Sequence, residues 1–319
     1  MGHLADSRVA PPPAVNPVRV HVRVPASSAN LGPGFDALGL ALGLYNEIDA
    51  QESERVTVTI EGEGAAQLAT SEDNVVVRAV RAAHEAAGRP FRGCALACVN
   101  RIPLARGLGS SAAAWVGGLV AGNALLGSPL DRETLLALAA RAEGHPDNVA
   151  AALLGGLTVA YGGADGARAL SLPVPDSLRW IILVPGVSMS TAEARAILPQ
   201  SVSRADAVFN VQRVALLLAS LQSGRVDLLP SALEDRLHEP YRLRLFPWMT
   251  EVVAAARAAG ALGCVLSGAG PSLLAVADDD VTAATVARAM EHTLDAAGVK
   301  GEARSLPVDT SGALSRVVS

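Results

Sequence analysis

The fold of this 319-residue chain is decided by the stretch Pro103-Leu104-Ala105-Arg106-Gly107-Leu108-Gly109-Ser110-Ser111-Ala112-Ala113. A glycine-rich turn opens here directly into an apolar helix. Glycine allows the backbone to bend and to approach a ligand closely. The two serines fall where the first free N–H groups of the helix point outward, at the positive end of the helix dipole. The stretch therefore predicts an anion site, and the other motifs of the chain favour phosphate as the anion.

This loop differs from two common nucleotide-binding patterns. A Walker loop ends in Gly-Lys followed by Ser or Thr, but the single lysine of the chain is Lys300. The dinucleotide fingerprint requires a third glycine where this chain has Ala112. A phosphate must then be held by backbone N–H groups, hydroxyls, a metal ion and arginine. On the loop alone, a flexible turn with a serine helix cap stays open as the alternative.

The composition narrows the class of protein. Half of the residues (50%) are apolar but only 3% are aromatic, so the core must be built from Ala, Val and Leu. A chain of this length is sufficient for two domains, each with its own core. The formal net charge of −5 argues against nucleic acid or an anionic membrane as a partner. Cys94, Cys98 and Cys264 lie in apolar runs, which is typical of reduced, buried thiols in a cytoplasmic protein.

The N-terminal segment is predicted to lie outside the folded part. Residues 1–17 contain Pro11-Pro12-Pro13 and lack a hydrophobic stretch, so we expect a disordered arm and no signal peptide. No apolar run reaches membrane-spanning length without charge or glycine. We therefore predict a cytoplasmic protein with no membrane partner, and assembly into a homodimer stays open.

Hydrophobic periodicity predicts an α+β chain in two blocks. Val20, Val22 and Val24 alternate with polar residues as in a half-buried strand. Strands are predicted at 18–24, 56–60, 95–102, 157–161, 180–184, 264–267, 273–276 and 302–306. Helices are predicted at 73–87, 110–126, 128–143 (with Ser128 as its cap), 146–154, 205–221, 248–259 and 281–297, with a short one before Pro199. The segment Gly162-Gly163-Ala164-Asp165-Gly166 is the predicted boundary between the blocks.

The loop after the first strand is a candidate ligand site. It reads Pro25-Ala26-Ser27-Ser28-Ala29-Asn30-Leu31-Gly32-Pro33-Gly34-Phe35-Asp36. The amide of Asn30 offers a donor and an acceptor, and the carboxylate of Asp36 suits an ammonium group. An Asx turn that only stabilises the loop itself is the equally weighted alternative.

A second polar cluster is Glu143-Gly144-His145-Pro146-Asp147-Asn148, which interrupts an apolar helical region. Glu143 suits Mg²⁺, which prefers one or two carboxylates plus phosphates and water. His145 and Asn148 are candidates for contact with a substrate, and a structural histidine is the alternative. Pro146 next to Asp147 favours a helix start at that position over a catalytic base.

Two further clusters lie in the C-terminal half. Thr191 and Arg195 are four residues apart and share one helix face, and with Arg242 they are candidates for a carboxylate fork. Each arginine alone is better explained as a solvated charge. The turn Ser267-Gly268-Ala269-Gly270-Pro271-Ser272 is expected to close over phosphates or over the loops of the site.

With these motifs in place, the chain resembles the GHMP family of small-molecule kinases from Val18 to about Leu306. The family's motif P-x-x-x-G-L-G-S-S-A is matched at 103–112, and its C-terminal glycine motif at 267–272. V-P-A-S-S-A-N-L-G-P-G-F-D at 24–36 and E-G-H-P-D-N-V at 143–149 resemble the members that act on homoserine. Mevalonate kinases carry a lysine where this chain has Ala26.

The resemblance implies a two-domain α+β fold. A mixed N-terminal α/β domain, 18–165, would bind ATP through the glycine-rich loop, and a ferredoxin-like domain would follow at 166–319. The loop from Pro103 to Ala113 would hold ATP, and Ser110, Ser111 and Glu143 would hold Mg²⁺. The residues expected to bind the substrate are Asn30, Asp36, His145, Arg195 and Arg242, with Asp36 on its ammonium and the arginines on its carboxylate. Asn148, Thr191 and Arg195 would lie near the transferred group.

The reaction implied by the resemblance is phosphorylation of L-homoserine by ATP, a step toward threonine. Phosphoryl transfer can proceed largely by alignment and charge neutralisation, which agrees with the lack of an evident strong base. A kinase for another small alcohol, such as threonine or mevalonate, is one alternative. A nucleotide-binding relative without catalysis is the other.

Overall fold

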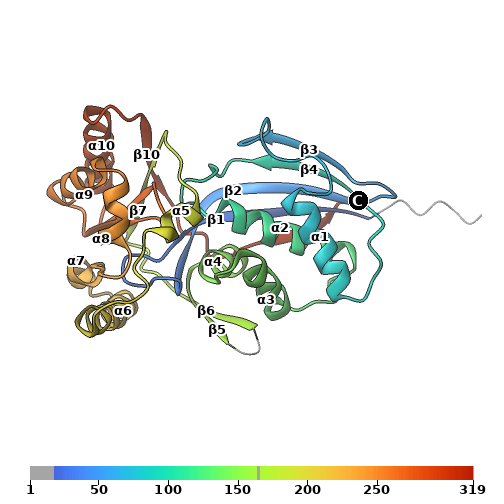
Figure 1. Cartoon of the computed structure of the whole chain (residues 1–319), viewed down its shortest axis with the longest axis horizontal. Coiled ribbons are helices and arrows are strands. Elements are labelled where there is room, and N and C mark those ends of the chain that lie inside the picture. The colour runs from blue at the N-terminus through green and yellow to red at the C-terminus, as the bar shows by residue number, and fades with distance from the viewer. Residues whose placement is uncertain (1–17, 164–165, 319) are drawn as a thin grey trace, which may run out of the picture.

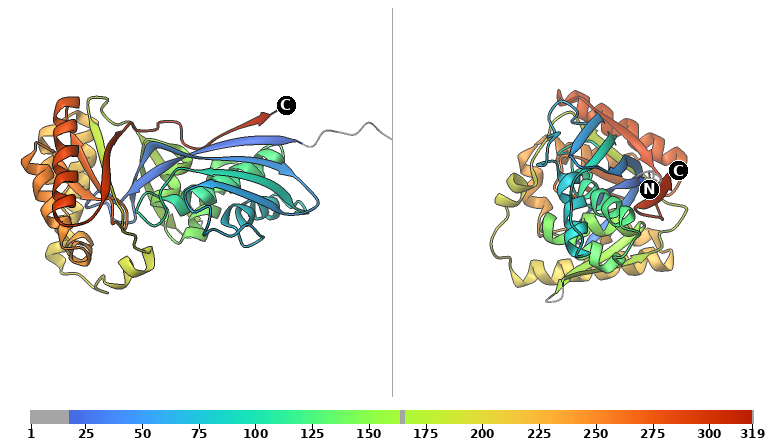
Figure 2. Two further views of the ribbon diagram at one scale, coloured as in Figure 1. Left: turned by 90° about the horizontal axis from the view of Figure 1, so that it is seen from above. Right: turned by 90° about the vertical axis from the view of Figure 1, so that its right-hand side faces the viewer.

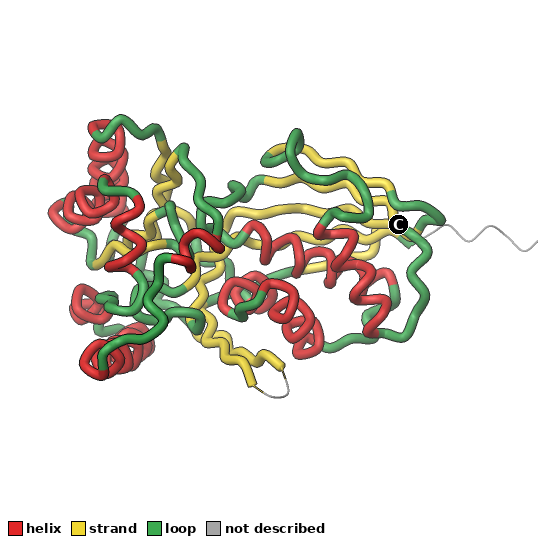
Figure 3. The backbone as a smooth tube through the Cα atoms, viewed as in Figure 1, coloured by secondary structure: helices red, strands yellow, loops and turns green. Residues whose placement is uncertain are grey.

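The protein consists of two sheets joined end to end, each covered by helices (Figure 1). The computed structural model describes residues 18–163 and 166–318. The N-terminal arm predicted at 1–17 lies outside these residues. The tube in Figure 3 separates a strand-rich N-terminal body from a C-terminal body whose outer side is helical.

The larger sheet has seven strands in the order β11-β1-β2-β4-β3, with a β5–β6 hairpin attached to β2. Only β3 and β4 are parallel, and the other neighbours are antiparallel. Their bounds are β1 Arg19–Ala29, β2 Leu38–Glu52, β3 Thr57–Gly62, β4 Cys94–Asn100, β5 Leu157–Gly163, β6 Gly166–Leu172 and β11 Leu314–Val318.

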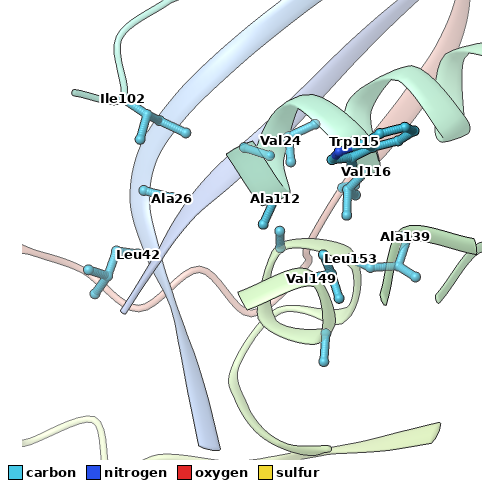
Figure 4. Close-up of a cluster of buried hydrophobic side chains, with 14 of the residues drawn as sticks. Val24, Ala26, Leu42, Ile102, Ala112, Trp115, Val116, Ala139, Val149 and Leu153 are labelled. Carbon is cyan, nitrogen blue, oxygen red and sulfur yellow. The ribbon is translucent and has the colours of Figure 1, made fainter. Parts of the chain in front are cut away.

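Four helices cover one face of this sheet (Figure 2). They are α1 Val75–Ala86, α2 Ser110–Leu125, α3 Arg132–Glu143 and α4 Asp147–Leu154. Helix α2 is central: Ala112 and Val116 lie between Val24 of β1 and Val149 of α4 (Figure 4). Burial on nearly every side explains why its sequence is apolar all round. The N-terminus of α2 therefore has a fixed place at the junction with the second sheet.

The second sheet has the order β10-β7-β9-β8, and all its pairs are antiparallel. Its strands are β7 Arg179–Pro185, β8 Gly263–Leu266, β9 Leu273–Ala277 and β10 Gly301–Leu306. Helices α9 (Trp248–Ala258) and α10 (Asp280–Ala296) pack on it and complete a β-α-β-β-α-β order. This order confirms the predicted ferredoxin-like arrangement. The remaining helices described for this part of the chain are α5 Thr191–Ala196, the long α6 Arg204–Ser223, η1 Val226–Leu228, α7 Leu229–Ala232, α8 Glu239–Arg242 and η2 Leu243–Leu245.

The sequence patterns did not predict strands β2, β6 and β11. The first half of β2 is buried on both faces, so it lacks the alternation that marks a half-buried strand. Strand β11 is short and exposed, and among the described residues its strand partner is β1, from Arg19 opposite Val318 to Arg23 opposite Leu314.

The chain passes between the sheets at a different place from the predicted one. Ala164 and Asp165 lie outside the described residues, and the strands that flank them form the β5–β6 hairpin of the large sheet. The crossing follows β6, between 173 and 178, and the chain returns to the large sheet through β11. The glycine run thus marks a hairpin, which needs the same backbone freedom as a linker.

Two further predictions, the cap of α3 and the burial of the cysteines, can be compared with the structure. Asp131, and not Ser128, caps α3, because its carboxylate accepts a hydrogen bond from Thr134 N at 2.8 Å. The three cysteines are buried as expected, and burial raises the thiol pKa of Cys94 to about 11 and of Cys98 to about 12. Within residues 18–163 and 166–318, the structure contains no helix with the length and apolar character needed to cross a membrane.

Candidate active site

The glycine-rich loop ends in an uncapped helix N-terminus. Ala105, Gly107 and Gly109 have positive φ values of 52°, 74° and 68°. Gly109 is the N-cap of α2 and supplies no side-chain bond. The first backbone hydrogen bond back to it comes from Ala113 N at 2.8 Å, so earlier N–H groups stay available. The serine-cap alternative is therefore wrong, and the N-terminus of α2 keeps the free N–H groups that the predicted anion site requires.

The second glycine turn packs directly on this loop. Ser267 Oγ donates to Gly107 O at 2.6 Å, and a Cβ on Gly107 would collide with Ser267 O. The Arg106 guanidinium donates to Pro185 O at 2.9 Å and to Gly186 O at 3.1 Å. The loop thus lies between both sheets, and Arg106 bonds to backbone carbonyls of the second one.

A cavity of about 230 Å³ lies in front of the loop. Most of the residues predicted for the site line it: Asn30, Asp36, Pro103, Ala105, Arg106, Gly107, Leu108, Gly109, Ser110, Ser111, Glu143, His145, Asn148, Thr191, Arg195 and Arg242. Leu104 lines neighbouring cavities instead. Ala112 and Ala113 are fully buried in the core, so they support the loop and do not face this cavity.

Three hydrogen bonds connect the loop, strand β1 and the helices of the site. Ser111 Oγ donates to Glu143 Oε2 at 2.8 Å, which joins the start of α2 to the end of α3. Ser27 Oγ donates to Asn148 Oδ1 at 2.9 Å, and Ser27 N donates to Leu108 O at 3.1 Å. Ser27 is fully buried and was missed as a site residue, because its role depends on a partner far away in the sequence.

Asp147 begins α4, as predicted, and also orients His145. Its Oδ1 accepts from Asn148 N at 2.7 Å and lies 2.8 Å from His145 Nδ1. Burial lowers the pKa of His145, but the hydrogen bond and charge of Asp147 and the charge of Glu143 outweigh this, and the net pKa is raised. The His145 ring is thus held at the cavity with a stronger tendency to carry positive charge.

Opposite charges meet on the far side of the cavity. Arg195 donates from Nη1 to Asp36 Oδ2 at 3.0 Å and from Nη2 to Asp36 Oδ1 at 2.6 Å. Both side chains keep over a third of their surface exposed, 37% and 36%. Asn30 is more constrained, because its Nδ2 donates to Gly268 O at 2.8 Å and its Oδ1 accepts from Asp36 N at 3.0 Å. Asn30 therefore positions Asp36.

Arg242 is a buried cation at the same cavity. It is only 2% exposed, and burial and the neighbouring charge of Arg195 lower its pKa to about 10. Its Nε donates to Ala194 O at 3.2 Å. The ring of Phe35, a second residue that was missed, lies 5.2 Å from the Arg242 guanidinium carbon and 5.5 Å from that of Arg195.

An apolar cavity of about 420 Å³ adjoins the other side of the loop. It shares Ala105, Ser110 and Ser111 with the first cavity. Its walls come mainly from β2, β3, α1, α2 and the loop between β3 and α1, and they include Ile48, Ile60, Leu68, Val76 and Ala114. These scattered core-like residues carry no motif, so the sequence did not indicate this cavity.

Comparison with known proteins agrees with this geometry. Models for the GHMP kinase N-terminal and C-terminal domains match residues 74–156 and 217–296. The chain is 48% identical to homoserine kinase of Moorella thermoacetica over 80% of this chain and 86% of that one. For homoserine kinase of Deinococcus radiodurans the identity is 44%, over 91% and 95%. The crystal structure of homoserine kinase from Cytophaga hutchinsonii has a TM-score of 0.86 at 32% identity, over 93% and 97%.

Two α+β bodies with a glycine-rich loop between them are the architecture that this chain shares with a small-molecule kinase of known structure, the Cytophaga hutchinsonii enzyme. Within that class, the chain belongs to the GHMP kinase family, and this confirms the resemblance seen in its motifs.

Proposed function

We propose that this chain is an ATP-dependent kinase that phosphorylates the side-chain hydroxyl of L-homoserine, as its named relatives do. The observation that carries the proposal is a single cavity with the phosphate loop on one wall and Asp36, Arg195 and Arg242 on the other. A carboxylate beside two guanidinium groups is complementary to the ammonium and carboxylate of an amino acid. An uncharged alcohol could not pair with the charges of these three side chains.

The residues around the loop fit a magnesium ion. Ser111 Oγ and Glu143 Oε2 lie 2.8 Å apart, and Ser110 lines the same cavity. One carboxylate and hydroxyl oxygens, completed by phosphate and water, are a typical Mg²⁺ environment. In the described part of the chain, no group of three or more His, Cys, Asp or Glu suits a metal, in keeping with an ion held mainly by the nucleotide. When bound, the ion would neutralise phosphate charge.

The reaction moves the γ-phosphoryl group between two oxygens. The bond from the γ-phosphorus to the oxygen bridging it to the β-phosphate breaks, and a bond to the homoserine oxygen forms. The hydroxyl proton leaves to phosphate or solvent. The helix N-terminus stabilises phosphate charge, and Asn148, Thr191 and Arg195 lie where they can align the transferred group.

The apolar cavity beside the loop suits the base and ribose of ATP, since nucleotide pockets are largely apolar and must adjoin the phosphate site. Ala114→Phe places a ring in this cavity. We expect it to raise the Kd for ATP and to leave the Kd for homoserine unchanged in calorimetry. An unchanged Kd for ATP would place the base elsewhere.

Gly109→Val is expected to weaken ATP binding by roughly tenfold or more, about 1.4 kcal/mol. The new Cβ would collide with Ser27 Oγ and lie 3.0 Å from Asn148 Oδ1. Gly127→Val is the matched control, because Gly127 also has positive φ, 80°, but has no atom within 4 Å of the new Cβ. Both variants should lose stability through backbone strain, and only Gly109→Val should lose ATP affinity in calorimetry. If Gly109→Val loses affinity for ATP and for homoserine equally, the result would point to misfolding of the turn.

The function itself is tested by ADP release in the presence of homoserine, threonine or mevalonate. We expect homoserine to give much the largest kcat/KM. Preference for threonine or mevalonate would favour another kinase of this family. ATP binding without ADP release for any of the three would favour a non-catalytic nucleotide-binding protein.

A further inference from the structure

His238 is a fully buried histidine directly behind the cavity, and no motif pointed to it. It precedes α8 and is 0% exposed. Its Nε2 lies 2.8 Å from Gly32 O in the loop after β1, and its Nδ1 lies 3.2 Å from Arg242 Nη1. The ring thus bridges the loop that carries Asp36 and the buried arginine of the cavity.

The two partners, Gly32 O and Arg242 Nη1, determine which ring nitrogen of His238 carries the hydrogen. A carbonyl oxygen can only accept, so Nε2 must donate to Gly32 O. A guanidinium nitrogen can only donate, so Nδ1 must accept from Arg242. The only assignment that satisfies both bonds is the neutral ring with its hydrogen on Nε2.

The surrounding groups support a neutral ring. Burial lowers the pKa of His238, and the charge of Arg242 lowers it further, while Asp235 and Asp36 act in the opposite direction. Asp235 does not compete for the ring, because its Oδ2 is 3.7 Å away and already accepts from His238 N and Glu239 N at 2.8 Å each. The ring of Phe35 stacks on the imidazole at a centroid distance of 5.1 Å.

The hydrogen bonds of Arg242 show how the His238 ring helps to hold the guanidinium in place. Nη1 donates to His238 Nδ1 at 3.2 Å and to Gly268 O at 3.3 Å, and Nε donates to Ala194 O. Among the described residues no acceptor bonds to Nη2, and Arg242 lines the cavity. One edge of the guanidinium is therefore held by the protein, and Nη2 remains for a ligand.

We propose that His238 is a positioning residue: as the neutral Nε2–H tautomer, it accepts a hydrogen bond from Arg242 and orients that guanidinium toward the carboxylate of the amino-acid substrate. The proposal rests on the proposed function for the identity of the substrate. The tautomer and the arginine contact rest on geometry alone.

Two substitutions separate the two bonds of the ring. His238→Gln retains a donor near the place of Nε2 and removes the acceptor for Arg242. His238→Asn retains an acceptor near the place of Nδ1 and removes the donor to Gly32 O. Loss of a hydrogen bond to a charged group predicts that His238→Gln raises the KM for homoserine roughly 10- to 100-fold. His238→Asn should raise it less, and both should keep the kcat and the Kd for ATP near wild type.

The matched control is His292→Gln, at an exposed position of α10. It should leave the KM for homoserine and the kcat unchanged. A larger KM effect for His238→Asn than for His238→Gln, or equal effects, would overturn the orienting role. A fall in kcat with no change in KM would also overturn it.

A second measurement does not depend on homoserine as substrate, and it needs only one of the two His238 variants to fold. Long-range ¹H–¹⁵N spectra of the wild-type protein at neutral pH distinguish the ring nitrogens of its six histidines. We expect one non-titrating ring with its hydrogen on Nε2, and its signal should be missing in whichever His238 variant folds. A hydrogen on Nδ1, or on both nitrogens, would overturn the proposal. If wild type fails to phosphorylate homoserine, the proposed function fails while this spectrum still decides the tautomer.

Discussion

Glu143→Gln is expected to lower kcat on the order of 100-fold or more while the protein stays folded. The amide oxygen of glutamine can still accept the bond from Ser111 Oγ, which is 2.8 Å in the native protein, so the local structure is kept. The negative charge is lost, and with it the attraction for a divalent cation beside the phosphates. The effect therefore falls on catalysis and not on folding.

Initial rates over a series of magnesium concentrations measure this effect. The variant should need more magnesium for half-maximal rate and should keep the wild-type melting temperature. Glu133→Gln is the control, because Glu133 is exposed at the other end of the same helix α3. If Glu143→Gln keeps the wild-type magnesium dependence, Glu143 does not contribute to the metal site.

Arg242→Met is expected to weaken the binding of homoserine and to leave the affinity for ATP nearly unchanged. Removing one partner of a buried charge-assisted pair costs about 2–5 kcal/mol, or roughly 30- to 4,000-fold in affinity. Methionine fills much of the same volume, so the loss is one of charge and hydrogen bonding. Arg244→Met is the control, since Arg244 is exposed two residues further along the chain.

Substrate analogues assign each charge to one end of the amino acid. Arg242→Met should respond little when the carboxylate is replaced by an ester, because its partner is already absent. Asp36→Asn should show the same insensitivity to removal of the amino group. KM values for homoserine, its ester and its deamino analogue measure both effects. If each variant responds to both analogues as wild type does, neither residue contacts the amino acid.

The sequence predicted those parts of the site that local chemistry determines. The loop at 103–111 could be read because glycine, serine and a following apolar helix carry their meaning within one short segment. Asp147 was placed correctly at a helix start because Pro146 precedes it. The ferredoxin-like domain was implied by the resemblance, and the β-α-β-β-α-β order of the second body agrees with it.

The rest depends on contacts between distant segments. Ser27 contacts Asn148, and His238 contacts Gly32 and Arg242. No rule of sequence spacing connects these positions. Strand β2 was missed because a strand buried on both faces loses its alternation. Arg106 is part of the phosphate-loop motif, yet its side chain bonds to carbonyls of the second sheet. A motif identifies the backbone path and leaves the direction of each side chain open.

The pairing of β1 with β11 has a consequence for biosynthesis. Arg19 lies opposite Val318, so β1 receives one of its two neighbouring strands from residues that are translated long after it. Until those residues leave the ribosome, the outer edge of β1 has unpaired N–H and C=O groups that can recruit strands from other chains. Truncation of the chain just before residue 314 should therefore promote aggregation more than the few exposed side chains of β11 suggest. During translation, the need for chaperones should persist until β11 has emerged from the ribosome.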